Sequence, residues 1–575
     1  MLHRADSNRE RGARRLTSVG VVLARPGRQV LADLRSKRRR RRMADFDFMD
    51  ALYRAYVATI FGGAALWWLA LRVGGSAVAS TTAHRVAVDG PQVVGLVIAM
   101  ALAVGLRSGG RGGPLVLEAA DVRHLLLAPL DRGLALRGPA LRLLRFGATW
   151  GVGVGAVFGV LASRRLGGQW PAWAASGALV GASAVDGALG AAMAVSGARL
   201  GRRMAGWLAL AALAWSAADV VLARATSPMS LVGQVALWPL RWRAGGLAGV
   251  AFALLAVVSG VGLAGRTSVE ASERRSSLAG QLRFAVTVRD LRSVILIRRQ
   301  LAQDGVRQRP WARLPGAPLL PRAASKKPWH DPQRPRHRAG HGSALWRRGC
   351  HGLLRFRATR VARLALLGAL AGAAAVGAWR GTTPLVLAAG LALYIAGLDA
   401  LEPVAQSVDH PTLLDAYPLE RGLALVGLLA APTAVMLVVG VVGAATAVAV
   451  TGGSTTALTV APVLLIPASL AGLAGAAVST VQGSPPLFSA SDLLLPPEAV
   501  GAKVFFRTLW PPLVSTAGML PVLAARRASG SVVQSAVSAG VPVLVLVAGV
   551  LVWVRYRDRI HDAFQDAMGG TRPRA

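Results

Sequence analysis

Ionisable residues inside long apolar stretches are the first candidates for chemistry in this 575-residue chain. Asp186 lies in the stretch SGALVGASAVDGALGAAM, 16 residues after Trp170 and 13 residues before Arg199. At a rise of about 1.5 Å per helical residue, its carboxylate is about 20 Å from either end of that stretch, near mid-membrane. A charged group is costly there, so Asp186 is a candidate for handling a substrate or protons. The alternatives are an aspartate hydrogen-bonded to a neighbouring helix, or a membrane span that lies elsewhere along the chain.

Three further acids lie close to the ends of apolar stretches. Asp219 is four residues before Ala223, and we expect its carboxylate to reach water there. Asp399 and Glu402 close another stretch, where solvation at the membrane interface is expected to accommodate both charges.

The signatures of common catalytic sites are missing from the sequence. It contains no G-x-x-x-x-G-K-[ST] motif and no glycine followed by lysine, so the chain has no P-loop for ATP. It also contains no H-E-x-x-H motif and no C-x-x-C pair. Metal-ligating residue types gather in and after a polar insert: His330, His337, His341, Cys350 and His351. Their spacing matches no compact metal site, so we expect no bound metal, no cofactor and no enzymatic activity.

The most specific pattern is a ten-residue stretch that occurs twice, 289 residues apart. Residues 129–138 read PLDRGLALRG and residues 418–427 read PLERGLALVG, with eight of ten positions identical. We call these two stretches the elbows. Proline suits the first turn of a helix and an acid is favoured at a helix N-terminus, so each elbow is expected to open a helix. The residues predicted to form a docking surface are Pro129, Leu130, Asp131, Arg132, Pro418, Leu419, Glu420 and Arg421. The alternative is a loop end that only fixes the topology.

Composition places these residues in a membrane protein. The chain has 53% hydrophobic residues and a mean hydropathy of +0.47, and its apolar residues are concentrated in long runs. The net charge of +39 is expected to lie in cytoplasmic loops, where lysine and arginine determine the orientation. The basic run 37–42 is interpreted as an anchor that binds anionic lipid headgroups. We expect no nucleic-acid partner, because the basic clusters flank apolar runs and carry no interleaved aromatic residues.

Twelve apolar stretches have about the length that a helix needs to cross ~30 Å of hydrocarbon. They lie at 55–79, 91–106, 144–162, 170–197, 205–223, 245–265, 361–379, 383–400, 423–450, 457–481, 508–525 and 531–554. All must be helical, because lipid offers no partner to backbone polar groups. The elbow repeat divides them equally, so we predict an all-α integral membrane protein of about 12 transmembrane helices in two tandem six-helix repeats. Arginine placement predicts that both termini and both elbows are cytoplasmic.

The segments between the apolar stretches complete the predicted domain order. It is a basic N-terminal segment at 1–42, a six-span domain at 43–265, an insert at 266–360, a second six-span domain at 361–560 and a tail at 561–575. Within the insert, helical spacing predicts an amphipathic helix at 282–301, and composition predicts a disordered linker at 303–347. The segment 226–243 is predicted to contain a short helix at the membrane interface.

Glycines at four-residue intervals predict close helix packing. Gly151, Gly155 and Gly159 form one such series, and Gly368 and Gly372 form another. Small residues at this spacing let helix backbones approach one another in a membrane.

The elbows give the chain a resemblance to bacterial ABC-2 type exporter permeases. Permeases of that family have six spans per domain and a leucine-proline-x-x-arginine-like element in the cytoplasmic loop after the second span. Here 128–132 and 417–421 occupy that place, although the order is proline-leucine. The predicted helix 282–301 resembles the surface helix before the first span of such domains, and the segment from Leu495 to Arg507 is also similar.

The resemblance implies a plasma-membrane permease with two fused transmembrane domains. A separate cytoplasmic ATPase subunit would dock on the elbows, so that ATP acts through this partner and drives export by alternating access. One rival is a major-facilitator-like secondary transporter, because 131–133 reads Asp-Arg-Gly between the second and third spans. Another rival is a membrane-embedded lipid-modifying enzyme, which would use a group of residues at one membrane face: Asp399, Glu402, Asp409, His410 and Asp415.

Overall fold

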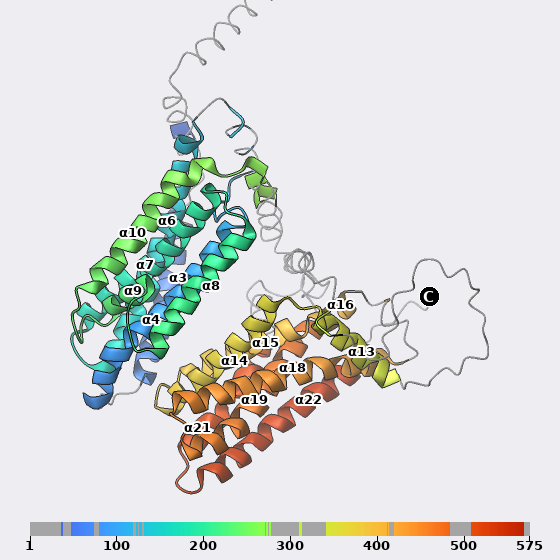
Figure 1. Ribbon diagram of the computed structural model, residues 1–575. Helices are drawn as coiled ribbons and strands as arrows, with labels where there is room; N and C mark the ends of the chain where they lie inside the picture. The colour runs from blue at the N-terminus through green and yellow to red at the C-terminus, as the bar shows by residue number, and fades with distance from the viewer. Residues whose placement is uncertain are drawn as a thin grey trace, which may run out of the picture. The chain divides into compact units, whose positions relative to one another are not determined.

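A computed structural model gives the arrangement of most of the chain (Figure 1). It describes residues 36–37, 48–73, 80–118, 122, 124, 126–128, 131–270, 272–273, 275–277, 310–312, 341–410, 412, 419–482 and 508–567. These residues form helices and connecting segments, and none of them lies in a β-strand. The predicted helix 282–301, most of the predicted linker, and Pro129, Leu130 and Pro418 lie outside the described residues. The chain divides into two compact units, Met1–Phe284 and Ala285–Ala575, here called unit 1 and unit 2.

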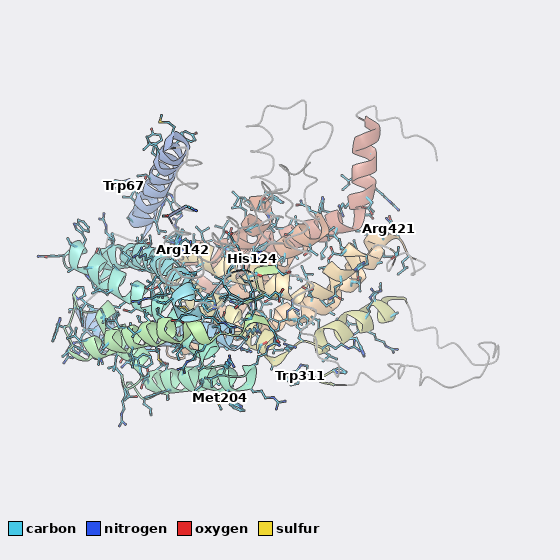
Figure 2. The ribbon with its side chains drawn as sticks, turned by 90° about the horizontal axis from the view of Figure 1, so that it is seen from above. Trp67, His124, Arg142, Met204, Trp311 and Arg421 are labelled. Atoms are coloured by element: carbon cyan, nitrogen blue, oxygen red, sulfur yellow. The ribbon has the colours of Figure 1, made fainter. Side chains whose placement is uncertain are left out.

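Unit 1 is a bundle of long helices. Its helices are α3 (Phe48–Arg72), α4 (Ser80–Gly109), α6 (Arg132–Leu166), α7 (Trp170–Gly197), α8 (Arg202–Val221), α9 (Pro228–Ala236), α10 (Gly245–Leu263) and the 3₁₀ turn η1 (Ala264–Arg266). Helix α7 is central, because it packs against α6, α10, α4 and α9. Helix α3 touches α6 only sparsely and stands apart from the other helices of the bundle, as the position of Trp67 shows (Figure 2).

Unit 2 is a second helical bundle of similar order. Its helices are α13 (His341–Leu354), α14 (Ala358–Trp379), α15 (Leu385–Ala400), α16 (Glu402–Asp409), α18 (Arg421–Val450), α19 (Thr455–Gln482), α21 (Leu520–Arg526) and α22 (Val532–Ala567). Helices α18 and α19 pack against each other, and α14, α15 and α22 surround them. Several of these pairs have counterparts in unit 1: α6 with α7, α4 with α7, and α10 with α7.

The described helices are those of a multi-pass membrane protein. Ten helical stretches of the described residues are long and apolar enough to cross a membrane, among them Thr508–Arg526, which ends with α21; the number is eleven if the pair α15 and α16, which is bent by 58°, counts as one span. Helix α3, which covers most of the predicted span 55–79, is not among the ten. Large apolar side chains point outward from both bundles, for example Phe158, Leu255 and Leu366. Lipid solvates such side chains, while the helices satisfy their own backbone hydrogen bonds.

The predicted glycine contacts are confirmed. A Cβ atom placed on Gly151 would lie 2.5 Å from the carbonyl oxygen of Gly181, and one on Gly155 or Gly159 would overlap the backbone of α7. In unit 2, a Cβ on Gly368 would lie 2.7 Å from the carbonyl oxygen of Val439, and Gly372 meets the backbone of Gly443 in the same way. Each series therefore allows two helix backbones to touch, α6 with α7 and α14 with α18.

The structure defines two predicted helices more exactly, α6 and α9, and corrects part of the predicted linker. Helix α6 begins at Arg132, within the elbow that was expected to open a helix, and it runs without a break through the predicted span 144–162, because a helix continues past the hydrocarbon as long as its own hydrogen bonds are made. Helix α13 begins inside the predicted linker, and its buried Leu345 packs against Gly427 of α18. Helix α9 is the predicted short helix, and six of its residues are buried among neighbouring helices of the bundle.

Candidate functional site

Both elbows start a helix at the same position of the repeat. Helix α6 begins at Arg132 and helix α18 begins at Arg421, residues that are 289 positions apart. The structure thus corrects the expectation that the prolines occupy the first turn, since each helix begins three residues after its proline. The residues just before the arginines, Asp131 and Glu420, hold the N-cap positions.

The helix that opens each elbow buries one face and exposes another. In the first elbow, Ala135 and Leu136 are both only 2% exposed, while Asp131 and Arg132 are exposed. In the second elbow, the equivalent Ala424 and Leu425 are buried, while Glu420 and Arg421 are exposed (Figure 2 labels Arg421). The partly buried Leu419 precedes them. Each elbow therefore presents an acid and an arginine from a helix end that an alanine-leucine pair anchors.

The acid of the first elbow caps its own helix. Oδ1 of Asp131 accepts a hydrogen bond of 2.9 Å from the backbone N–H of Gly133, and the extended backbone of Asp131 (φ −61°, ψ 112°) directs the side chain back over the first turn. The same turn packs on η1, because a Cβ atom on Gly265 would lie 2.7 Å from the Cα of Gly133. Asp131 thus stabilises the start of α6 and leaves Arg132 at the surface.

The acid of the second elbow binds another helix. Glu420 forms an ion pair with Arg559 of α22, with Nε 3.0 Å from Oε1 and Nη2 3.3 Å from Oε2. Its side chain makes no capping hydrogen bond to α18. Gly422, two residues after Glu420, lies against the backbone of Arg555, which is one turn before Arg559 on α22. The C-terminal part of α22 thus lies beside the second elbow.

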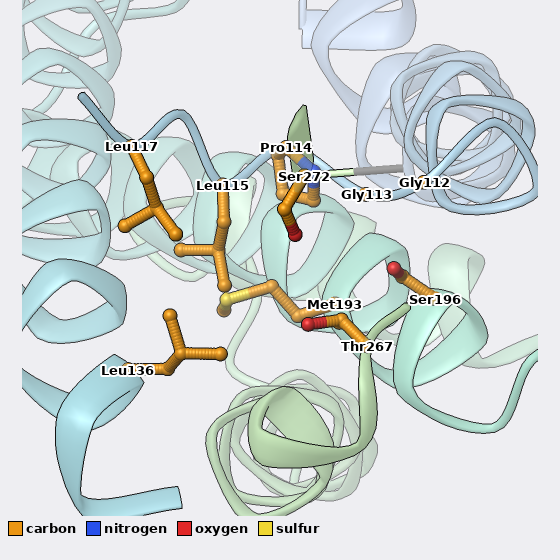
Figure 3. Close-up of a pocket in the computed structure, with 10 residues that line it drawn as sticks. All are labelled: Gly112, Gly113, Pro114, Leu115, Leu117, Leu136, Met193, Ser196, Thr267 and Ser272. Atoms are coloured by element: carbon orange, nitrogen blue, oxygen red, sulfur yellow. The ribbon is translucent and has the colours of Figure 1, made fainter. Parts of the chain in front are cut away.

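A small hollow lies behind the first elbow in unit 1 (Figure 3). Its apolar side consists of Leu115, Leu117, Leu136 and Met193, and its polar rim includes Ser196, Thr267 and Ser272. One turn after Ser272, the guanidinium of Arg275 donates a hydrogen bond of 3.1 Å to Oγ of Ser108. Burial, together with the neighbouring Arg111, lowers the pKa of Arg275. The elbow end of unit 1 is therefore a packed, basic surface.

Asp186 lies where α7 faces α6. A Cβ atom placed on Gly147 would be 2.7 Å from Oδ1 of Asp186, so the glycine provides the space for the carboxylate. Gly147 is two residues after the exposed Arg145 on α6, and Asp186 lies 11 residues before the end of α7 at Gly197. Oδ1 is buried and has no hydrogen-bond partner among the residues that the structure describes, so the predicted bond to a neighbouring helix is not seen for this oxygen.

The expectation that Asp219 reaches water is wrong. Asp219 is 2% exposed, and its carboxylate accepts hydrogen bonds from the chain that leads into α9. The hydroxyl of Thr226 donates to Oδ1 at 2.6 Å, and the backbone N–H of Ser227 donates to Oδ2 at 2.8 Å. The backbone N–H of Thr226 lies 3.2 Å from both oxygens. Asp219 thus holds the start of α9 against α8, and these donors offset the cost of burying its charge.

The acids at the end of α15 are bound to arginines and not simply solvated. Arg363 Nε lies 3.0 Å from Asp399 Oδ2, and Arg360 Nη2 lies 3.8 Å from Asp399 Oδ1 and 3.3 Å from Glu402 Oε2. The guanidinium of Arg360 also lies over the ring of Phe356, 4.4 Å from its centroid. This network of two acids and two arginines spans the bend between α15 and α16.

Metal-ligating residue types do not gather in the described part of the chain. Its residues contain no group of three or more histidines, cysteines, aspartates or glutamates that could hold a metal ion. Cys350 and His351 lie on α13, which packs against α18, and burial raises the pKa of the Cys350 thiol. His330 and His337 lie outside the described residues.

Comparison with known proteins identifies no relative. No protein-family model matches the chain, and neither a curated protein nor a solved structure is similar to it.

Proposed function

We propose that this chain is the membrane-spanning permease subunit of an ABC-2 type exporter, powered by a separate cytoplasmic ATPase. The observation that carries the proposal is the equivalence of the two elbows. In both copies a helix begins at the same arginine, buries the same alanine-leucine pair and exposes an acid beside the arginine. Fixing the topology requires only positive charge, whereas a repeated, rigidly anchored acid-arginine pair fits a partner that has two equivalent docking sites.

In this proposal the protein lies in the plasma membrane with both termini and both elbows in the cytoplasm. ATP-driven dimerisation of the partner displaces the starts of α6 and α18, and the two six-span halves rock so that a path opens alternately to each side. The chain itself binds no cofactor, and anionic lipid headgroups contact its basic segments. Asp186, at the elbow side of the α6–α7 contact, is the candidate polar group beside the path.

Reversal of charge at the elbows tests the docking. Arg132→Glu combined with Arg421→Glu is expected to abolish co-purification of the ATPase from native membranes, measured by mass spectrometry of the bound subunit. The matched control is Arg164→Glu combined with Arg527→Glu, which reverses two exposed arginines outside the elbows, one in the last turn of α6 and one at the C-cap of α21. Undiminished association of the elbow variant, at an unchanged elution volume in size-exclusion chromatography, would remove the docking proposal.

The two rival functions predict different results. A major-facilitator-like secondary transporter would co-purify with no ATPase, and its transport would follow an ion gradient and not ATP. A lipid-modifying enzyme requires acids that are available for chemistry, whereas Asp399 and Glu402 form ion pairs with Arg360 and Arg363. This pairing favours a structural role for these two acids.

A further inference from the structure

The two units differ in how they use their first helix. In unit 2, α14 packs on α18 through Gly368 and Gly372, which meet the backbone at Val439 and Gly443. In unit 1, the helix in the same place is α3, and its apolar side chains are largely exposed, including Tyr56, Ile60, Trp67 and Trp68. Figure 2 shows α3, marked by Trp67, away from the remaining helices of its bundle.

The face of α6 that corresponds to the α14 contact is uncovered. The repeat spacing of 289 residues relates Val439 to Trp150, Gly443 to Val154 and Ala447 to Phe158. The three residues of α18 are buried, whereas Trp150, Val154 and Phe158 are 60%, 48% and 67% exposed. Phe146 continues this row at four-residue spacing, and its ring meets that of Trp150 edge to face with centroids 6.2 Å apart. We call Phe146, Trp150, Val154 and Phe158 the aromatic stripe of α6.

Exposure to lipid alone does not require a partner for this stripe, because lipid chains are as apolar as the side chains. Two further observations identify the helix that fits it. Helix α3 already touches α6 in the structure, and it precedes the elbow by the same number of long helices as α14 does. Helix α3 also carries small residues at four-residue spacing, Thr59 and Gly63, and a Cβ atom on Gly63 would meet no atom within 4 Å.

We propose that α3 docks along the aromatic stripe of α6, parallel to it, with Thr59 and Gly63 beside Trp150 and Val154. In this arrangement the large side chains of α6 pack against the small residues of α3. In unit 2 the corresponding contact joins two glycines, Gly372 of α14 and Gly443 of α18. Aromatic side chains against a small-residue face gain dispersion contacts, which drive helix association in lipid. The occupant is the α3 of the same chain. The inference concerns the architecture of unit 1 and holds whether or not an ATPase docks on the elbows.

Cysteine cross-linking in membranes tests the inference. Cys350 is the only cysteine, so Cys350→Ser gives a full-length background without cysteines. In this background Gly63→Cys with Val154→Cys is expected to form a disulfide within one chain on mild oxidation, detected as a linked peptide by mass spectrometry. A second pair, Thr59→Cys with Trp150→Cys, tests the same register without altering a glycine.

Two control pairs calibrate the result. Gly187→Cys with Ala253→Cys is the positive control, because a Cβ atom on Gly187 lies 3.3 Å from that of Ala253, close to disulfide geometry. Trp68→Cys with Phe158→Cys is the negative control, because it joins the stripe to the opposite face of α3. Linkage of both test pairs well above the negative control supports the docking. Linkage between two chains, or linkage no greater than that of the negative control, would overturn it.

Discussion

Most of the buried apolar side chains that the structure describes in unit 2 form one cluster, from Leu345 on α13 to Val554 on α22. Among the described residues of unit 1, the clustered ones form three groups, around Leu136, around Val195 and around Ile98, and others such as Trp173 belong to none of them. Between these clusters the helices of unit 1 meet through glycine backbones and buried polar groups, including Asp219. The two units each contain an elbow and have several equivalent helix pairs. They nevertheless differ in packing, because a larger apolar cluster stabilises unit 2 and separate smaller clusters stabilise unit 1. We therefore expect large-to-small substitutions to lower the free energy of unfolding most in unit 2. Small-to-large or polar-to-apolar substitutions are expected to lower it most in unit 1.

The largest expected effect is at the backbone contact between α6 and α7. In Gly155→Leu the new side chain would collide with the backbone of Gly177, which cannot give way as a side chain can. Overpacking typically costs about 1–3 kcal/mol and more where the neighbour is fixed, so we expect most of the protein to misfold. The measurement is the monodisperse fraction in detergent and the unfolding midpoint.

Two matched variants sharpen this prediction. Gly153→Leu lies on the same helix with no atom within 4 Å of its Cβ position, and we expect it to be nearly neutral. Gly372→Leu makes the corresponding collision with Gly443 in unit 2. Equal stability of the Gly155 and Gly153 variants would show that the α6–α7 contact does not hold unit 1 together.

An intermediate effect is expected at Asp219. Asp219→Ala leaves the backbone N–H groups of Thr226 and Ser227 without their acceptor in a buried place. An unsatisfied buried donor costs about 1–3 kcal/mol, so we expect a loss of about 3 kcal/mol in the free energy of unfolding. The control is Asp89→Ala, since Asp89 is exposed on α4. A loss no larger than that of the control would contradict a structural role for the carboxylate.

The smallest expected effects separate the two elbows. Asp131→Ala removes an N-cap hydrogen bond and should cost about 1 kcal/mol. Glu420→Ala removes an exposed ion pair with Arg559, and such pairs contribute about 0–1 kcal/mol, less at high salt. Thermal unfolding at low and high salt measures both. The reverse order, with Glu420 the more important residue, would mean that α22 and not the capped helix end maintains the elbow.

Sequence patterns predicted the helical class, the positions of most spans and the close glycine contacts. These features depend on local composition and on spacing along one helix. Hydropathy alone missed the part of α6 before residue 144, and only the elbow motif predicted a helix start near Arg132, because hydropathy detects the part of a helix that lipid solvates and not the part that projects beyond it. Helix α13 was also missed, although Leu345, Gly349 and Leu353 follow one another at four-residue spacing within the basic composition.

The surroundings of the acids could not be predicted from the sequence. The donors to Asp219 lie seven and eight residues further along, after a chain reversal, and the partners of Asp399 lie on another helix. Sequence placed the acids of both elbows correctly at helix N-termini. It did not distinguish Asp131, which caps its helix, from Glu420, which binds α22, because Arg559 is 139 residues away along the chain.

The continuity of α6 has a mechanical consequence. The helix is 35 residues long without a break, about 50 Å at 1.5 Å per residue, and α7 packs against it along Gly151, Gly155 and Gly159. Gly155, the middle residue of this contact, lies 23 residues after Arg132 and 11 residues before Leu166. A tilt of α6 about the middle of this contact therefore moves the elbow end about twice as far as the opposite end, and in the opposite direction.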